Sequence, residues 1–173
     1  MRIRSADPAG DAAACAAIYA PFVQSTAISF EDEAPDAAQM LERMANRYPW
    51  LVAEDGGQVV GFAYASRHRD RSAYRWAVDV AIYVDPQRQR RGLARALYEE
   101  LFGLLSEQGF RVACAGITLP NDASVALHTK LGFQLVGVYR RIGWKLGAWH
   151  DVAWYQRPLM AAKTGPPREP GSA

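Results

Sequence analysis

The sequence predicts a single α/β domain, because strand patterns and helical patterns alternate along its length. The clearest strand signal is a hairpin, in which Trp50–Ala53 and Val59–Tyr64 flank the turn residues Asp55-Gly56-Gly57. The clearest strand-to-helix signal follows it. There, an apolar strand from Trp76 to Val84 leads through a short basic turn into a helix from Gly92 to Gln108. A chain of 173 residues is long enough to bury one substantial core.

The segment before the hairpin contains a short strand and two helices. Arg2–Arg4 is the opening strand, and the turn Asp7-Pro8 precedes an alanine-rich helix from Asp11 to Tyr19. Pro35–Asn46 is the second helix, because its methionines and leucine recur at helical spacing. These elements place two helices ahead of the hairpin.

The segment after the hairpin continues the alternation. A basic loop at Arg67–Arg71 separates the hairpin from the next strand, and Gly109 is a suitable cap for the long helix that follows that strand. The remaining elements are the strand Val112–Ile117, the helix Asp122–Leu131, the strand Phe133–Tyr139 and the final strand Val152–Met160. We assign residues 1–162 to one domain. Residues 163–173 hold three prolines and two glycines, so we expect a disordered C-terminal tail.

Composition and charge exclude several classes of protein. Half of the residues are hydrophobic and 22% are charged, as in an ordinary globular protein. The net charge of +2 gives no overall field for nucleic acid or for a membrane surface. Cys15 and Cys114 stand apart in apolar surroundings, so we expect neither a metal site nor a disulfide framework. The sequence shows no signal peptide and no membrane span, and we expect a cytoplasmic protein.

The basic turn is the most informative functional signal. It reads Gln89-x-x-Gly92-x-Ala94 and opens a helix that has Arg and Gly where a capping Ser or Asp would be expected. The free backbone N–H groups and the positive end of the helix dipole therefore form a site for an outside anion. A solvated charged turn or a nucleic-acid patch is the alternative, and Gly92 argues against both because it permits close backbone approach.

This motif resembles the pyrophosphate-binding signature of the GCN5-related N-acetyltransferases (GNAT), which use acetyl-CoA. Other stretches are similar to the phosphinothricin and methionine sulfoximine acetyltransferase branch of that family. They are Tyr48–Ala53, Leu119–Asp122, Ser124-Val125, Leu131–Phe133 and Trp149–Val152. The resemblance covers roughly residues 3–159. It implies the GNAT fold, with a mixed and mostly antiparallel central sheet flanked by helices. It also implies acetyl transfer to the α-amine of a small amino-acid analogue, and a homodimer.

The same resemblance assigns contacts for acetyl-CoA. Backbone groups of Ile82, Tyr83 and Val84 are expected to pair with the pantetheine arm, and Asn121 to hold it from the other side. The basic turn and the first helical turn would bind the pyrophosphate through Gln89, Arg90, Arg91, Gly92, Leu93, Ala94 and Arg95.

Two residues are candidates for managing the proton of the acceptor amine. Asp79 interrupts an apolar strand, where desolvation would raise the pKa of its carboxyl and suit it to act as a base. The family has glutamate at this position, so the shorter aspartate implies a bridging water. His128 lies seven residues after Asn121, where many relatives carry a tyrosine that protonates the departing thiolate. The alternatives are a structural carboxylate paired with an arginine, and a helix histidine bound to neighbouring carbonyls. The sequence does not decide which residue is the principal base.

The predicted substrate-binding residues come mainly from a cationic loop. An amino-acid substrate needs a cation for its α-carboxylate, and Arg71 together with Arg75 would supply it. Phe30 matches an aromatic residue of the branch and would wall the pocket. Trp149, His150 and Asp151 could shape the pocket or a dimer contact, or they could be core and surface residues. The alternative functions are acetylation of protein N-termini or polyamines, and a non-catalytic sensor that binds CoA.

Overall fold

The computed structural model describes residues 1–88, 92–160 and 167–171. Its strands form one seven-stranded sheet in the order β1-β2-β3-β4-β5-β7-β6. The strands are β1 (Arg2–Ser5), β2 (Trp50–Asp55), β3 (Gln58–Arg67), β4 (Ala77–Val84), β5 (Val112–Leu119), β6 (Gln134–Lys145) and β7 (Ala148–Pro158). The pairing of β4 with β5 is parallel and the other pairings are antiparallel. The prediction of a mixed, mostly antiparallel sheet flanked by helices is confirmed.

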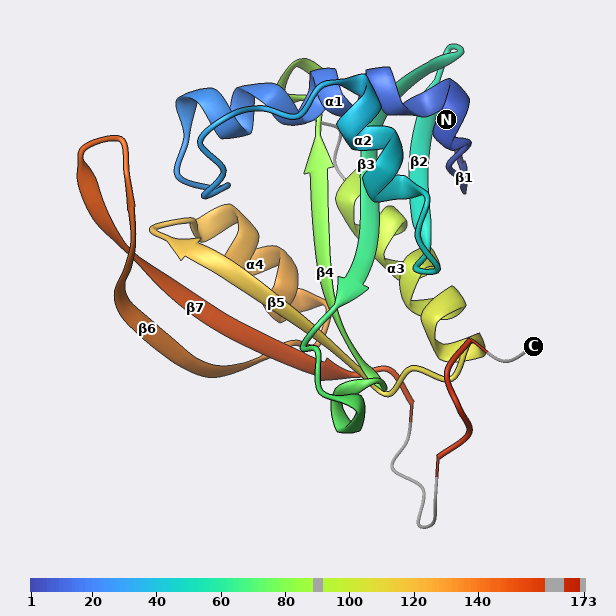
Figure 1. Cartoon of the computed structure of the whole chain (residues 1–173), viewed down its shortest axis with the longest axis vertical. Coiled ribbons are helices and arrows are strands. Elements are labelled where there is room, and N and C mark those ends of the chain that lie inside the picture. The colour runs from blue at the N-terminus through green and yellow to red at the C-terminus, as the bar shows by residue number, and fades with distance from the viewer. Residues whose placement is uncertain (89–91, 161–166, 172–173) are drawn as a thin grey trace.

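Helices cover both faces of the sheet, as Figure 1 shows. Helices α1 (Pro8–Ser25) and α2 (Ala37–Met44) pack on one face, whereas α3 (Leu93–Glu107) and α4 (Asp122–Lys130) lie on the other. Two short 3-10 turns are η1 (Ser72–Tyr74) and η2 (Pro86–Arg88). Within the described residues, no helix is both long enough and apolar enough to cross a membrane.

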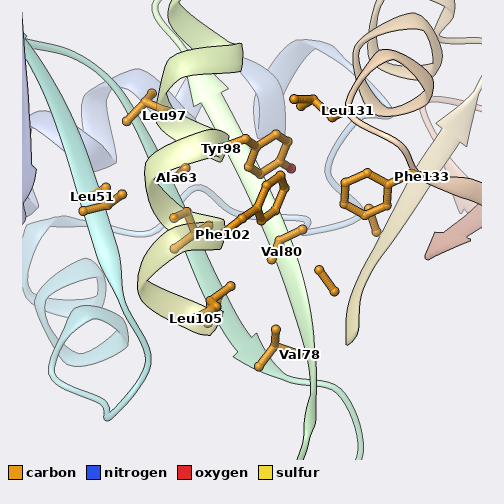
Figure 2. Close-up of a cluster of buried hydrophobic side chains, with 14 of the residues drawn as sticks. Leu51, Ala63, Val78, Val80, Leu97, Tyr98, Phe102, Leu105, Leu131 and Phe133 are labelled. Carbon is orange, nitrogen blue, oxygen red and sulfur yellow. The ribbon is translucent and has the colours of Figure 1, made fainter. Parts of the chain in front are cut away.

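The larger hydrophobic core lies between α3 and the sheet. Figure 2 shows the Tyr98 and Phe102 rings side by side beneath α3, with Phe133 facing them. Val78 and Val80 of β4 point into this core, and both are buried. Because side chains alternate along a strand, Asp79 between them points to the opposite face, which carries α1 and α2.

The sheet splits between β4 and β5. These strands pair only at Ala77, Val78 and Asp79, whose partners are Val112–Cys114. Beyond that point β4 stays paired with β3 as far as Val84, and β5 stays paired with β7 as far as Leu119. In Figure 1 the two strands meet at the bottom of the view and separate above it. The split leaves a gap at the centre of the sheet.

Several elements are longer than the sequence predicts, and α1 and β6 differ most. Helix α1 runs from Pro8 to Ser25, whereas the sequence predicts Asp11 to Tyr19, and it continues through Pro21 although proline removes one helical hydrogen bond. Strand β6 continues to Lys145, and β7 begins at Ala148, so the final hairpin is longer than expected. An irregularity in register between Tyr139 and Gly143 breaks the two-residue alternation that would have marked this part of the strand.

A buried lysine ties the long hairpin to the loop after α1. Lys145 is 8% exposed, and its Nζ donates to the carbonyl oxygens of Val23, Ser29 and Glu31 at 2.6, 2.6 and 2.8 Å. An ammonium group has three donors, so this arrangement satisfies all of them away from water. The contact holds the α1–α2 loop against β6.

The C-terminal segment also makes defined contacts. Arg75 forms an ion pair with Glu169, and Nε1 of Trp76 donates to the carbonyl of Arg168 at 2.8 Å. Gly171 donates its N–H to the carbonyl of Gln108, beside the end of α3 (Figure 1). Residues 167–171 thus contact the domain through side-chain and backbone groups, and the disorder expected for residues 163–173 stays a prediction.

Candidate active site

The gap between β4 and β5 exposes backbone groups of β4. The N–H of Asp85 donates to Val60 on β3, whereas the carbonyl of Trp76 accepts from Arg111 and Val112 next to β5. Because backbone groups alternate sides along a strand, Val80, Ile82 and Val84 direct theirs toward β5. The last shared pair, Asp79 with Cys114, uses the N–H of Val80. Beyond it, Ile82 and Val84 have no ladder partner on this side among the described residues. The gap therefore offers an edge to which an extended ligand can add as a further strand.

The backbone of Tyr83 differs from its expected role. By the same alternation its N–H and C=O face β3, where it pairs in register with Phe62. Ile82 and Val84 are therefore the residues of the predicted trio whose backbone faces the gap. The Tyr83 ring packs on the α1 face instead, 4.7 Å from the ring of Tyr19 between centroids.

The opposite wall of the gap is formed by β5 and the start of α4. Asn121 caps α4, because its side-chain oxygen accepts the N–H of Ser124 at 3.1 Å. Its amide nitrogen has no hydrogen-bond partner among the described residues, and Asn121 lines the gap together with Thr118 and His128. This geometry agrees with the predicted role of Asn121 opposite β4.

His128 lies buried behind the gap. Its Nδ1 is 2.8 Å from the carbonyl oxygen of Ser124, so this nitrogen carries the proton, and Nε2 can accept from the hydroxyl of Tyr98 at 3.2 Å. Burial lowers the pKa of His128, and the bond to Ser124 acts in the opposite direction. The bond to Ser124 is the contact with a helix carbonyl that the sequence analysis gave as the alternative role of His128. The His128 side chain also lines the gap.

The entrance to α3 has the geometry expected of an anion site. Gly92 is the N-cap residue, its φ is +93°, and no side chain caps the helix there. Leu93 is buried in the core, Ala94 is half-buried, and Arg95 is exposed and pairs with Glu99 on the same helix at 2.7 Å. The predicted contacts Gln89, Arg90 and Arg91 lie outside the described residues.

Asp79 is bound to a histidine that sequence reasoning did not single out. Its carboxylate lies 2.6 Å from Nδ1 of His68, which follows the end of β3. Burial raises the pKa of the Asp79 carboxyl, and the hydrogen bond to His68 acts in the opposite direction. The sequence analysis gave a carboxylate paired with an arginine as the alternative role of Asp79. In the structure its partner is His68. Antiparallel pairing of Arg67 with Val78 brings the next residue, His68, close to Asp79, and the sequence pattern alone does not give that register.

Other side chains gather around this pair. Sγ of Cys114, a carboxylate oxygen of Asp79 and Nδ1 of His68 lie within 4.8 Å of one another. Burial raises the pKa of Cys114 to about 11, so its thiol stays protonated near neutral pH. The guanidinium of Arg69 lies 5.7 Å from the ring centroid of Trp154, near enough to Asp79 to lower its pKa slightly. The expectation that no metal takes part stays a prediction.

The two arginines predicted for the substrate carboxylate are in different settings. Arg71 is exposed at the start of η1, where its backbone carbonyl accepts the N–H of Tyr74. Arg75 bonds the carboxylate of Glu169, and its guanidinium lies 4.0 Å from the ring centroid of Trp76. The Arg75 guanidinium therefore already has an anionic partner, whereas Arg69 is the loop arginine whose charge acts on Asp79.

The remaining predicted residues either contact the hairpin of β6 and β7 or belong to it. Phe30 lies against Gly143, where any side chain would collide with its ring, and its ring centroid is 6.2 Å from that of His150. Trp149 is 51% exposed, so it is not a core residue. Asp151 accepts from Arg140 and from the N–H of Arg141, and these bonds lower the pKa of its carboxyl.

The family is shown by comparison with known proteins. The model of the acetyltransferase (GNAT) family matches residues 15–133. The chain therefore belongs to the GNAT family of acetyltransferases. The gap, the capless entrance to α3 and the polar wall at Asn121 all lie within the matched residues.

Individual relatives are similar over nearly the whole chain. The phosphinothricin N-acetyltransferase of Streptomyces viridochromogenes is 42% identical, over 97% of this chain and 92% of its own length. The L-methionine sulfoximine/L-methionine sulfone acetyltransferase of Salmonella typhimurium is 36% identical, over 92% of this chain and 95% of its own length. A crystal structure of a phosphinothricin acetyltransferase from Sinorhizobium meliloti, in complex with AcCoA, is 38% identical. It covers 97% of this chain and 93% of its own, with a TM-score of 0.91.

The buried setting of His128 predicts a pH dependence of stability. Because the folded protein holds this proton less readily than the unfolded chain, the stability contribution is complete above the ordinary pKa of about 6.5. It is lost as the pH falls from there toward the lowered folded pKa. We expect the wild type to lose more unfolding free energy than His128→Asn between pH 7.5 and 5.5, measured by urea denaturation. Parallel losses in the two proteins would contradict the assignment.

Proposed function

We propose that this protein moves an acetyl group from acetyl-CoA to the α-amine of a small amino-acid analogue of the phosphinothricin, methionine sulfoximine or methionine sulfone type. The observation that carries the proposal is the split sheet, which has one proton-handling pair on each face. Asp79 and His68 lie on the face of α1 and α2, whereas His128 and Tyr98 lie on the face of α3 and α4. The printed substrates of the relatives support the choice of acceptor.

The residues of the gap fit acetyl-CoA. The backbone of Ile82 and Val84 offers an open edge for the pantetheine arm, and Asn121 offers from the other wall an amide nitrogen without a partner among the described residues. No described side chain caps α3 at Gly92, which leaves its N-terminus for the pyrophosphate, and the proposed contacts Gln89, Arg90 and Arg91 lie outside the described residues. Acetyl-CoA supplies the thioester whose acetyl group is transferred.

We assign the removal of a proton from the acceptor amine to Asp79. An amine near pH 7 is mostly ammonium and cannot attack until a base takes its proton. The raised pKa of Asp79 favours proton uptake, and a water can bridge the short carboxylate to the amine. His68 holds the carboxylate by its hydrogen bond and is partly exposed, so it links Asp79 to solvent.

We assign the protonation of the departing CoA thiolate to Tyr98 and His128. When the bond between the acetyl carbon and sulfur breaks, the sulfur leaves as a thiolate that needs a proton. Burial raises the pKa of Tyr98, so its phenol stays protonated and can turn its hydrogen bond from Nε2 of His128 to the departing sulfur. Nε2 of His128 is then free to take a proton from solvent and pass it to the thiolate, which is the stronger base because burial lowers the pKa of His128. This division gives the two candidate residues different roles.

The α-carboxylate of the substrate is assigned to Arg71, with Arg69 as the second cation of the loop. Neither guanidinium bonds a carboxylate among the described residues, whereas Arg75 bonds Glu169. A bidentate arginine contact is formed in the ground state and the transition state alike, so its loss raises KM more than it lowers kcat.

The reaction is tested with the variant Asp79→Asn, which keeps the shape of the side chain and removes the base. We expect kcat for methionine sulfone to fall by about 10²–10⁴-fold, measured by thiol release from acetyl-CoA. Loss of less than about tenfold would remove Asp79 from the role of base.

The control for this experiment is the amide of the same substrate, which keeps the amine and lacks the carboxylate. We expect the wild type to prefer the acid, and Arg71→Ala or Arg69→Ala to reduce that preference, with Arg75→Ala close to the wild type. Equal kcat/KM for acid and amide would contradict an amino-acid acceptor and favour peptide N-termini or polyamines.

The proposal includes a cytoplasmic homodimer. Both cysteines are free, as a reducing compartment would keep them. Strands β6 and β7 and the turn between them expose several large apolar side chains, and the hairpin extends away from α2 and α3 in Figure 1. These exposed side chains are Leu135, Val136, Tyr139, Ile142, Trp144, Leu146 and Trp149. Clustered aromatic and aliphatic side chains of this kind are typical of interfaces between subunits.

Assembly is tested by light scattering at micromolar concentration. We expect the mass of a dimer for the wild type, because a second copy would cover this apolar surface. The double variant Trp144→Lys/Trp149→Lys should shift the mass toward that of a monomer, because it places charge in the interface. A wild-type monomer at these concentrations would rule the dimer out.

A further inference from the structure

His68, Asp79 and Cys114 bring three kinds of metal ligand together on the face of the sheet that carries α1 and α2. One ring nitrogen of His68, a carboxylate oxygen of Asp79 and Sγ of Cys114 lie within 4.8 Å of one another. Imidazole, carboxylate and thiolate are the side-chain ligands that zinc takes in proteins. The proposed acetyl transfer uses Asp79 and His68 and leaves the thiol of Cys114 without a role.

Three neighbouring strands hold this cluster. Asp79 of β4 and Cys114 of β5 are register partners in the last pair before the sheet splits. Ala113 and Ala115 are buried in the core beneath α3, so the alternation of β5 directs Cys114 to the opposite face, beside Asp79. His68 follows the end of β3 and lies 2.6 Å from Asp79. Because the ligands come from separate strands, the spacing of cysteines along the sequence does not indicate them.

The separations of the ligand atoms are close to those of a zinc site. Bonds of about 2.0–2.3 Å in a tetrahedral arrangement place neighbouring ligand atoms about 3.3–3.7 Å apart. The contact between His68 and Asp79 would open by about 1 Å, and wider separations in the cluster would close by a similar amount. The His68 ring lies edge-on to the rings of Tyr74 and Trp154, which hold it near Asp79 before an ion binds.

The charge of the cluster suits a divalent ion. The Asp79 carboxylate and a Cys114 thiolate carry two negative charges, which balance Zn²⁺ when His68 is neutral. The thiol releases its proton to solvent as the sulfur binds the ion. Burial raises the pKa of both Asp79 and Cys114, and the charge of Arg69 acts in the opposite direction, so Arg69 lies near enough to repel a cation. Its side chain is exposed, and water and salt screen this repulsion.

The cluster is open to solvent on one side. The side chains of His68 and Asp79 are 16% and 27% exposed, whereas Cys114 is 8% exposed. An ion can therefore reach the cluster from solvent and keep a water molecule as its fourth ligand, as zinc does where a protein supplies three ligands.

We propose that His68, Asp79 and Cys114 bind one zinc ion, and that this ion blocks acetyl transfer because it occupies the Asp79 carboxylate. The ion is an inhibitor and takes no part in the reaction. The blocking rests on the proposed acetyltransferase function, whereas the binding of zinc does not.

Binding is tested on untagged, metal-free protein by calorimetry with Zn²⁺ and by absorbance with Co²⁺. We expect one zinc ion per chain, and with Co²⁺ a sulfur-to-metal charge-transfer absorption that requires a thiolate ligand. Cys114→Ala should remove this absorption and weaken zinc binding by at least about tenfold, because even a change in the partner of a ligand weakens metal affinity by about 10–100-fold. Cys15→Ala is the matched control, since Cys15 is the other free cysteine and is buried in the core under α1. It should bind zinc like the wild type.

Inhibition is tested by initial rates of acetyl transfer to methionine sulfone, followed by the loss of thioester absorbance because released CoA itself binds zinc. We expect zinc to inhibit the wild type and a chelator to restore the rate. Cys114→Ala should keep the wild-type rate without zinc and need at least about tenfold more zinc for half inhibition. Cys114→Ser keeps the size of the side chain and gives a second variant, and thermal unfolding shows whether each variant is folded.

The outcomes separate the zinc site from the proposed function. If zinc does not bind, or binds Cys114→Ala as tightly as the wild type, the zinc site is wrong and the function stands. If zinc binds through Cys114 and the rate of acetyl transfer is unchanged, the blocking is wrong and Asp79 loses its role as base. If the wild type acetylates no amino acid and zinc still binds through Cys114, the proposed function fails and the zinc site stands.

Discussion

The separation of β4 from β5 is the constraint on which the rest of the site depends. The two strands share three register pairs and then follow different neighbours, so the sheet consists of two parts joined at one end. A sheet normally pairs its central strands along their length, because unpaired backbone groups in the interior cost free energy. Here Ile82 and Val84 leave these groups available at the centre of the fold, where a ligand can complete the sheet.

The split also makes both faces of the sheet accessible to one reaction. Asp79 lies at the last shared pair and points to the face of α1 and α2, whereas Tyr98 and His128 approach the gap from the other face. Separate faces allow one group to accept a proton and another to donate one without direct contact between them. Their opposite pKa changes fit this division, since burial raises the pKa of Asp79 and lowers that of His128.

The walls of the acceptor side are held by contacts that are distant in sequence. Lys145 on β6 bonds three carbonyls around the α1–α2 loop, and Glu31 of that loop joins Arg43 of α2 to Tyr19 of α1. The loop is thus tied to the final hairpin and to α1 and α2, the two helices that cover this face of the sheet. A site held by several elements keeps its shape before the substrate arrives, which lowers the cost of ordering it.

The sequence predicted those parts of the site that depend on local patterns. Alternation identified the hairpin and β4, the missing cap identified Gly92, and a charged residue in an apolar strand identified Asp79. The partner of Asp79 required the register between β3 and β4, which an isolated strand pattern does not contain. That the buried Nε1 of Trp50 has no hydrogen-bond partner among the described residues follows only from the full set of its neighbours. The length of β6 was missed because a local irregularity interrupts its alternation.

Hydrogen exchange of the β4 amides tests the split sheet most directly. In the free protein, the amides of Ala81 and Tyr83 should exchange slowly because they face β3, whereas those of Ile82 and Val84 should exchange faster because they face the gap. Addition of CoA should slow the exchange of this second group selectively. Equal protection of both groups in the free protein, or no change on addition of saturating CoA, would contradict a gap that binds the cofactor as an added strand.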